Sequence, residues 1–354
     1  MRILVVLALV LGLAACGSTS PPPVNEAVPC AAGAIKGQGS SAQTGAVNTW
    51  IRNYQVACAD ASIEYASTGS GAGQQAFIAG TGGDFVGSDS PFAAADQPRA
   101  NAHCGSGPAI HLPMVVGPIA LAYTVAGVGD LRLRPATVAK IFARTVTAWN
   151  DPAIAADNPG VTLPTTTIVP VHRLDSSGTT DNFTTYLAAT APGDWTFGHA
   201  KVWAAPGGLA ETGNDGVSSA VARSDGAIGY VEWSYAQFHD LDTARVGNGA
   251  DEFVALTADA AARTVASAKG TGTGGDLQLG IDYNTTARGA YPIVLVTYEI
   301  VCQKGTPAAS LKLVRGFLSY TSSKAGQAAV TRLGYAPLPE QVRAKVATAV
   351  AALA

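Results

Sequence analysis

Three turns rich in glycine and hydroxyl residues carry the side chains that could do chemistry in this chain. They are residues 37–41 (GQGSS), 67–73 (STGSGAG) and 175–180 (DSSGTT), and each precedes a segment that can form a helix. The first turn of a helix exposes unpaired N–H groups at its positive end, and glycine lets a ligand approach them closely. Serine and threonine add neutral donors. Taken singly, each turn also fits an ordinary helix cap, but the set of three, without lysine, predicts a site for an oxyanion.

Two charged residues extend this prediction. Arg173 lies just before the third turn, where its guanidinium could hold an anion through two parallel hydrogen bonds. Its neighbour Asp175 makes a structural ion pair the alternative. Asp89, in the segment GSDSP, would add a hydrogen-bond acceptor, although a turn residue before Pro91 fits the spacing equally well.

An enzyme is the main alternative class. Residues 37–42 (GQGSSA) fit the loose dinucleotide pattern, with Glu64 further along, but the segment before them is a poor strand. The sequence has no G-x-S-x-G elbow for a serine hydrolase. Its histidines show no pair at metal-binding helical spacing; they are His103, His111, His172, His199 and His239. We therefore expect no catalysis, no cofactor and no metal.

Helical periodicity and short apolar runs alternate along the chain, which predicts an α/β fold. Helical stripes occur at Val47–Tyr54, Val138–Phe142, Phe183–Leu187, Leu311–Leu318 and Val342–Leu353. Runs of strand length occur at Leu112–Val116, Ile119–Val125, Thr167–Val171 and Ile293–Val301. The three turns lie at strand-to-helix junctions of this pattern.

Composition limits the partners. Charged residues make up only 13% of the chain and its formal net charge is −3, against a typical charged fraction of about 25%. A basic face for nucleic acid is therefore not expected. A bound anion would have to be held by local dipoles rather than by the overall field.

The N-terminus predicts export. Arg2 precedes the apolar run Ile3–Leu13, which is too short to span a bilayer and is typical of a signal peptide over residues 1–15. The following Cys16, in LAACG, matches a bacterial lipobox and would become the lipidated N-terminus. The proline-rich residues 16–30 would be a linker. We expect an extracytoplasmic protein attached to the cell membrane through the lipid on Cys16.

Four further cysteines remain, Cys30, Cys58, Cys104 and Cys302. Export favours two disulfides, and a zinc site is the alternative although no pair has C-x-x-C spacing. Four cysteines allow three connectivities. We predict Cys58 with Cys104 and Cys30 with Cys302.

Several longer segments resemble the periplasmic phosphate-binding proteins of bacterial phosphate ABC transporters. In family order these are GQGSSA at 37, STGSGAG at 67, GDFVGSDSPF at 83, HRLDSSGTTDNFTTYL at 172, GNDGV at 213, AIGYVEWSYA at 227 and YPIVLVTYEIV at 291. The resemblance implies a two-lobed periplasmic binding protein of type II-like fold with ligand between the lobes. Lobe I would combine residues 31–116 and 290–354, and lobe II would span 117–289.

The resemblance also implies roles for individual residues. The phosphate-binding residues would be Ser41, Ala42 through its backbone, Ser70, Asp89, Arg173, Ser177, Gly178 and Thr179, with Asp175 orienting Arg173. Many family members have Thr-Phe where this chain has Ser41-Ala42, so another side chain must cover that wall of the site. The partners would be inorganic phosphate and the permease subunits of the transporter.

Asp89 would select the ligand. Phosphate near neutral pH keeps a proton that it can donate to a carboxylate, whereas sulfate keeps none, and an unmatched buried polar group is costly. The remaining alternatives are a secreted phosphatase and a binder of another oxyanion, sulfate or molybdate, on the same fold.

Overall fold

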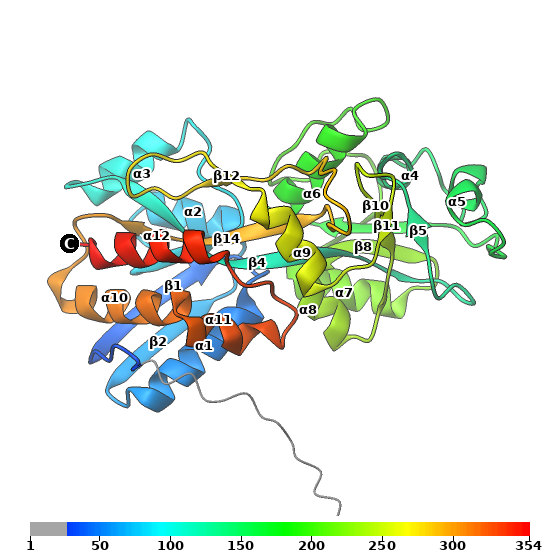
Figure 1. Ribbon diagram of the computed structural model, residues 1–354. Helices are drawn as coiled ribbons and strands as arrows, with labels where there is room; N and C mark the ends of the chain where they lie inside the picture. The colour runs from blue at the N-terminus through cyan, green and yellow to red at the C-terminus, as the bar shows by residue number, and fades with distance from the viewer. Residues whose placement is uncertain (1–26) are drawn as a thin grey trace, which may run out of the picture.

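The computed structural model describes residues 27–354. The predicted signal peptide, Cys16 and most of the linker lie outside these residues. The main sheet runs, in spatial order, through β2 (Ala61–Ala66), β1 (Gly33–Gly39), β3 (Phe85–Ser88), β14 (Val294–Cys302), β4 (Ala109–Thr124), β8 (Ala227–Glu232), β6 (Val169–Arg173) and β7 (Leu209–Glu211), and β9 (Asp242–Thr243) also pairs with β4. The molecule has two halves, and β4 and β14 run from one to the other (Figure 1).

The strand β4 joins the halves because it changes partner along its length. It pairs antiparallel with β14 as far as Pro118, and from Ile119 onward with β8. Sequence periodicity predicted two strands here, and the structure has one. Proline lacks an N–H for a regular ladder. Pro118 lies at the change of partner, and Pro113 lies at the register shift opposite Tyr298, so both are accommodated without ending the strand.

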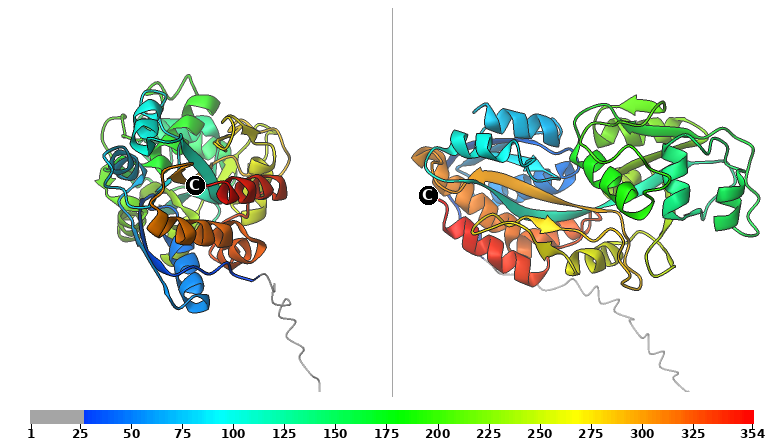
Figure 2. Two further views of the ribbon diagram at one scale, coloured as in Figure 1. Left: turned by 90° about the vertical axis from the view of Figure 1, so that its left-hand side faces the viewer. Right: turned by 90° about the horizontal axis from the view of Figure 1, so that it is seen from above.

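Helices cover the sheet in both halves. In the half that holds both termini of the described chain they are α1 (Thr44–Ala57), α2 (Ser70–Ile78), α3 (Gln97–Cys104), α10 (Ala308–Ser322), α11 (Lys324–Thr331) and α12 (Glu340–Ala351). In the other half they are α4 (Pro135–Phe142), α5 (Pro152–Asp157), α6 (Gly178–Thr190), α7 (Gly213–Arg223) and α8 (Trp233–Phe238) (Figure 2). All five predicted helical stripes therefore fall on helices, except that Leu353, the last residue of the fifth, follows the end of α12.

Smaller elements complete the second half and its connection to the first. One small sheet runs β11 (Phe253–Val254), β10 (Arg245–Gly247), β5 (Arg132–Leu133), and a hairpin is formed by β12 (Lys269–Gly270) and β13 (Leu279–Gly280). The helix α9 (Ala258–Ala266) packs on β4 and β14. Its Ala261 and Val265 enter the apolar cluster that also holds Phe77 and Val86.

Each half has its own large apolar core. One is built around Trp50, Tyr54 and Phe317, and the other around Trp149 and Phe183. Two packed cores joined by crossing strands make the α/β, two-lobed fold that the resemblance implied.

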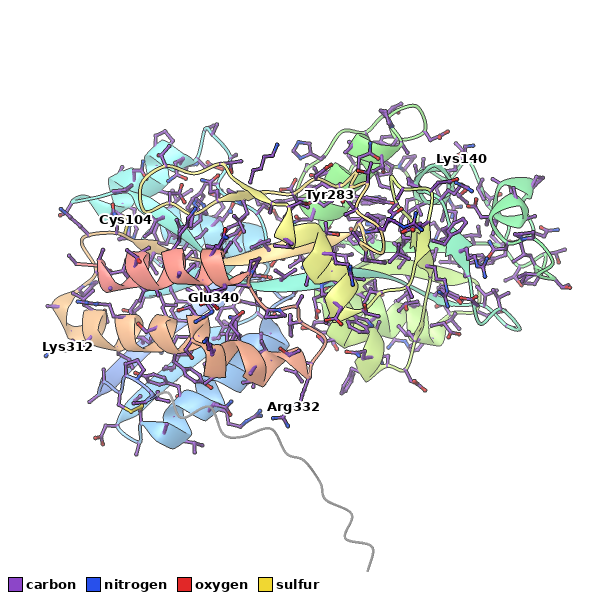
Figure 3. The ribbon with its side chains drawn as sticks, in the orientation of Figure 1. Cys104, Lys140, Tyr283, Lys312, Arg332 and Glu340 are labelled. Atoms are coloured by element: carbon purple, nitrogen blue, oxygen red, sulfur yellow. A yellow bond between two sulfur atoms is a disulfide. The ribbon has the colours of Figure 1, made fainter. Side chains whose placement is uncertain are left out.

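The disulfide pairing predicted from the sequence is wrong. The bonds join Cys30 to Cys58 and Cys104 to Cys302. Cys58 follows α1, which returns the chain to the start of β1, where Cys30 lies. Cys104 ends α3 beside the end of β14, where Cys302 lies opposite Ala109 (Cys104 is labelled in Figure 3). The order of the strands in the sheet decides which ends of helices and strands lie side by side. The spacing of the cysteines in the sequence does not give that order.

The two bonds should differ in their contribution to stability. They close loops of 198 and 28 residues, and chain entropy assigns about 5 kcal/mol to the longer and about 3.5 kcal/mol to the shorter. We expect the double variant Cys104→Ser/Cys302→Ser to lose more free energy of unfolding than Cys30→Ser/Cys58→Ser. Urea unfolding of both variants measures this, and an equal or reversed order would contradict it.

Candidate functional site

The starts of four helices converge where the two halves meet. Ser41 precedes α1, Ser70 begins α2, Thr179 lies in the first turn of α6, and Asn214 lies in the first turn of α7. The Asn214 amide donates to Ser41 Oγ at 2.9 Å and to Thr179 Oγ1 at 3.5 Å. Hydroxyls predicted from the first and the third turn are thus brought together. The first amides of each helix have no partner within that helix.

Asp89 lies at the centre of these hydroxyls, directly after β3, and is 3% exposed. Its Oδ1 accepts hydrogen bonds from Ser40 at 2.5 Å and Thr297 at 2.8 Å. Its Oδ2 has only long contacts, from Ser70 at 3.3 Å and Thr179 at 3.5 Å. Oδ2 is therefore the oxygen that can accept a further proton.

The protonation of Asp89 is set by opposing effects. Burial raises the pKa of Asp89, while the hydroxyls of Ser40 and Thr297 and the positive charge of Arg173 act to lower it. The net pKa lies above the ordinary value for aspartate. An anion that carries a proton could donate it to the Asp89 carboxylate, which is otherwise surrounded by hydrogen-bond donors.

Arg173 ends β6 and is 2% exposed. Its Nε donates to Asp175 Oδ1 at 2.7 Å and its Nη2 to Asp175 Oδ2 at 2.5 Å. Among the described residues, its buried Nη1 finds no hydrogen-bond partner. Burial raises the pKa of Asp175, but the bonds from Arg173 and from the Gly213 N–H hold it below its ordinary value. The ion pair therefore exists and still leaves one guanidinium nitrogen for a ligand.

Ser177 and Gly178 shape the start of α6. Ser177 Oγ accepts from the Thr180 N–H at 3.1 Å, so Ser177 caps this helix. A Cβ built on Gly178 would lie 2.6 Å from both Asp89 Cβ and Ser70 Oγ. Glycine is thus required where α6 of one half meets α2 and Asp89 of the other.

The first turn of the site is held by tyrosines. The Ala42 N–H donates to Ser40 Oγ at 3.0 Å, and Ala42 is fully buried. Tyr335 OH donates to the Ala42 carbonyl at 2.7 Å and Tyr235 OH to the Ser41 carbonyl at 2.9 Å. Two tyrosine hydroxyls thus hold the turn at which many family members have a phenylalanine and this chain has Ala42.

Several residues of the site were not predicted from the sequence. They are Ser40, Thr297, Asn214, Asn182, whose amide donates to the Asp89 carbonyl at 2.8 Å, and Lys201, whose pKa the charge of Asp89 acts to raise. Thr297 had a detectable signal, because it is a polar residue inside the apolar run Ile293–Val301. Burial lowers the pKa of Lys201. Asn182 is further held by Tyr283, which is labelled at the junction of the halves in Figure 3.

The surroundings of the site contain no grouped metal ligands. Within residues 27–354, no group of three or more His, Cys, Asp or Glu side chains is placed to hold a metal ion. His111 is buried against Asp276, and His172 stacks on Trp203. None of the helices in this described part is long and apolar enough to cross a membrane.

A cleft of about 270 Å³ leads to Asp89. It is lined by residues of both halves, among them Asp89, Pro91, Asn182, Thr185 and Tyr283. A larger hollow of about 590 Å³ lies between the β12–β13 hairpin and α12, and no predicted site residue lines it. Of the predicted site residues, Asp89 alone lines the smaller cleft, which therefore adjoins the site at this residue.

Known proteins resemble this chain along most of its length. The family model of the PBP superfamily domain matches residues 24–325. The phosphate-binding protein PstS 3 of Mycobacterium leprae is 40% identical over 345 residues, covering 96% of this chain and 93% of that protein. PstS 3 of Mycobacterium tuberculosis is 42% identical over 323 residues, covering 90% and 86%.

Solved structures show the same fold at lower identity. The phosphate-binding protein of Stenotrophomonas maltophilia has a TM-score of 0.71 at 21% identity, covering 90% of this chain and 94% of that one. The phosphate-bound structure of a periplasmic phosphate-binding protein, PfluDING, has a TM-score of 0.69 at 22% identity, covering 89% and 93%.

Two lobes with polar helix starts facing each other define a ligand-binding protein of the PBP superfamily. Within that superfamily, the identity to the mycobacterial proteins narrows the assignment. The chain belongs to the PstS family of phosphate-binding proteins.

Proposed function

We propose that this protein captures inorganic phosphate outside the cytoplasm and delivers it to the membrane permease of a phosphate ABC importer. The observation that carries the proposal is the pairing of two groups between the lobes. Asp89 offers a buried acceptor, and Arg173 Nη1 offers a buried donor that no other described residue uses. Neutral hydroxyls and helix starts surround both. This set matches an anion that carries a proton.

The proposed binding residues are those that the sequence suggested. Ser41, Ser70 and Thr179 would supply hydroxyls, and Gly178 would supply a backbone N–H. Ala42 and Ser177 would shape the turns, because their N–H groups donate to Ser40 Oγ and to the Lys201 carbonyl. We add Ser40, Asn214 and Thr297, because each hydrogen-bonds to one of these residues or to Asp89.

The lobes would close over the ligand about the crossing strands. We propose lobe I as residues 31–116 and 290–354 and lobe II as 117–289, with α9 packing back on lobe I through Ala261 and Val265. We also propose that Cys16 carries the lipid that attaches the protein to the cell membrane. The lipobox at residues 13–17 supports this assignment.

A panel of anions tests the proposed function. We expect phosphate and arsenate to raise the melting temperature, because both keep a proton at neutral pH, and sulfate and molybdate to leave it unchanged. Ligand at 100 times its Kd adds about 2.7 kcal/mol of stability. An equal shift with sulfate, or no shift with phosphate, would contradict the proposal. Incubation with a chromogenic phosphate ester should release no product, which separates a binding protein from a phosphatase.

A further inference from the structure

A buried glutamate lies behind the phosphate site. Glu299 on β14 is 1% exposed and pairs with Gly87 on β3 and Leu112 on β4. In the part of the chain that the structure describes, neither of its carboxyl oxygens has a well-formed hydrogen bond, and the same holds for Gln43 Oε1. The Gln43 side chain is its neighbour and acts to lower its pKa. A proton on Glu299 would satisfy both groups at once, because the acid could donate to Gln43 Oε1.

The surroundings of Glu299 disfavour its ionised form. The titratable groups that face it are Tyr65 from β2 and Asp89 from the end of β3, and neither supplies a positive charge. Burial raises the pKa of Glu299, the Gln43 side chain acts to lower it, and the charge of Asp89 raises it further; the resulting pKa is about 8. An ionised Glu299 could accept the second hydrogen of Gln43 Nε2, but Gln43 Oε1 would then still lack a donor.

Three hydrogen bonds, the last two joined through Ser40, connect Gln43 to Asp89. Gln43 Nε2 donates to Tyr65 OH at 3.0 Å, and Tyr65 OH donates to the Ser40 carbonyl at 3.0 Å. Ser40 Oγ then donates to Asp89 Oδ1 at 2.5 Å. Gly87 makes room for this series, since a Cβ there would lie 2.0 Å from Gln43 Nε2.

We propose that Glu299 is a positioning residue of the phosphate site, which as the neutral acid donates to Gln43 and so fixes Tyr65, Ser40 and Asp89. Loss of its proton removes the donor to Gln43 Oε1 and adds a negative charge behind Asp89. Both effects weaken the binding of an anion. The inference rests on the proposed function, and it makes phosphate affinity fall at alkaline pH through a group that does not touch the ligand.

The variant Glu299→Gln tests the proposal. Its amide can donate to Gln43 Oε1 as the neutral acid does, but it cannot ionise. Phosphate Kd is measured by calorimetry from pH 6.5 to 9.5 in both proteins, and the ratio of the two values cancels the titration of phosphate, of Asp89 and of the other buried glutamate, Glu232. We expect a ratio near one below about pH 7.5 and a loss specific to the wild type above pH 8, approaching tenfold per pH unit.

Two further measurements complete the test. The matched control Glu64→Gln, at an exposed glutamate paired with Lys36, should follow the wild-type profile. Without phosphate, the wild type should lose more melting temperature than Glu299→Gln as pH rises. A raised folded-state pKa contributes stability that is fully present below the ordinary glutamate pKa and is lost as pH rises towards about 8.

The outcomes are distinguishable. Parallel affinity profiles in two proteins that both bind phosphate would overturn the role of Glu299 and leave the proposed function intact. A large loss of affinity in Glu299→Gln at pH 7 would overturn it too, because the neutral isostere should suffice. If neither protein binds phosphate at any pH, the proposed function fails and the role of Glu299 at that site fails with it, whatever the melting curves show.

Discussion

Replacing Arg173 with alanine is expected to weaken phosphate binding roughly 100-fold at neutral pH. Two nitrogens of this guanidinium are held by Asp175, and the buried Nη1 has no partner among residues 27–354. A hydrogen bond to a charged group contributes about 1.5–3 kcal/mol, and 1.4 kcal/mol corresponds to a tenfold change in affinity. Calorimetric titration of phosphate into the folded variant measures the loss.

Two variants separate ligand binding from stability. Arg173→Lys keeps the charge and loses the planar fork, so its affinity should lie between those of the wild type and the alanine variant. Arg245→Ala removes an exposed arginine paired with Asp130, and it should bind phosphate normally. Urea unfolding shows whether Arg173→Ala is destabilised by leaving Asp175 unpaired. Near-native affinity in a folded Arg173→Ala protein would exclude Arg173 as a ligand.

Replacing Asp89 with asparagine is expected to abolish most of the discrimination against sulfate. A site built around a ligand hydrogen rejects the analogue that lacks it by about 10⁴-fold or more. Asparagine has the same shape but no charge, and its amide can donate to a sulfate oxygen. We expect the ratio of sulfate Kd to phosphate Kd to fall by at least about 100-fold, mainly through tighter sulfate binding. Competition titrations with both anions measure this ratio.

The position of Asp89 makes this prediction specific. Ser40 and Thr297 occupy its Oδ1 strongly, whereas the contacts to Oδ2 are long, so Oδ2 is the proposed acceptor of the ligand proton. Arsenate should continue to compete with phosphate in the wild type, because it also carries a proton. Asp60→Asn, at an exposed aspartate outside the site, is the control. Unchanged exclusion of sulfate by Asp89→Asn would remove Asp89 from the selective role.

Acidic conditions should act in the same direction as this substitution. Burial raises the pKa of Asp89 above that of a free aspartate, so Asp89 gains its proton at a higher pH than an exposed carboxyl does. Once protonated, it no longer repels sulfate. Selectivity measured at decreasing pH should therefore decline in the wild type and stay constant in Asp89→Asn.

Local chemistry made several residues of the candidate site predictable. Glycine and hydroxyl residues at a strand-to-helix turn identify a helix start with exposed amides, whatever the rest of the chain does. The starts of α2 and α6 were located in this way, and Ser70 and Thr179 lie together as expected. Helical stripes were equally informative, because the apolar face of a helix can be recognised from the spacing of the apolar residues within that helix.

Long-range pairing was not predictable from the same signals. Thr297 reaches Asp89 across 208 residues, and Cys302 reaches Cys104 across 198. Both contacts exist because β14, from the end of the chain, is placed between β3 and β4. Local sequence patterns do not indicate which strands become neighbours in the sheet. For this reason the disulfide prediction failed and Thr297 was overlooked.

By itself, the sequence determined the fold class, the helix starts and the kinds of donor that they present, because each depends on residues a few positions apart. The sheet order decided which cysteines bond and that a buried glutamate, Glu299, lies behind the candidate site. The tertiary structure likewise decided that β4 is continuous and that Arg173 keeps a nitrogen without a partner in the described chain. These features depend on burial and on contacts between elements that are distant in the sequence. Because buried polar groups lose their hydrogen bonds to water, they must form hydrogen bonds with one another.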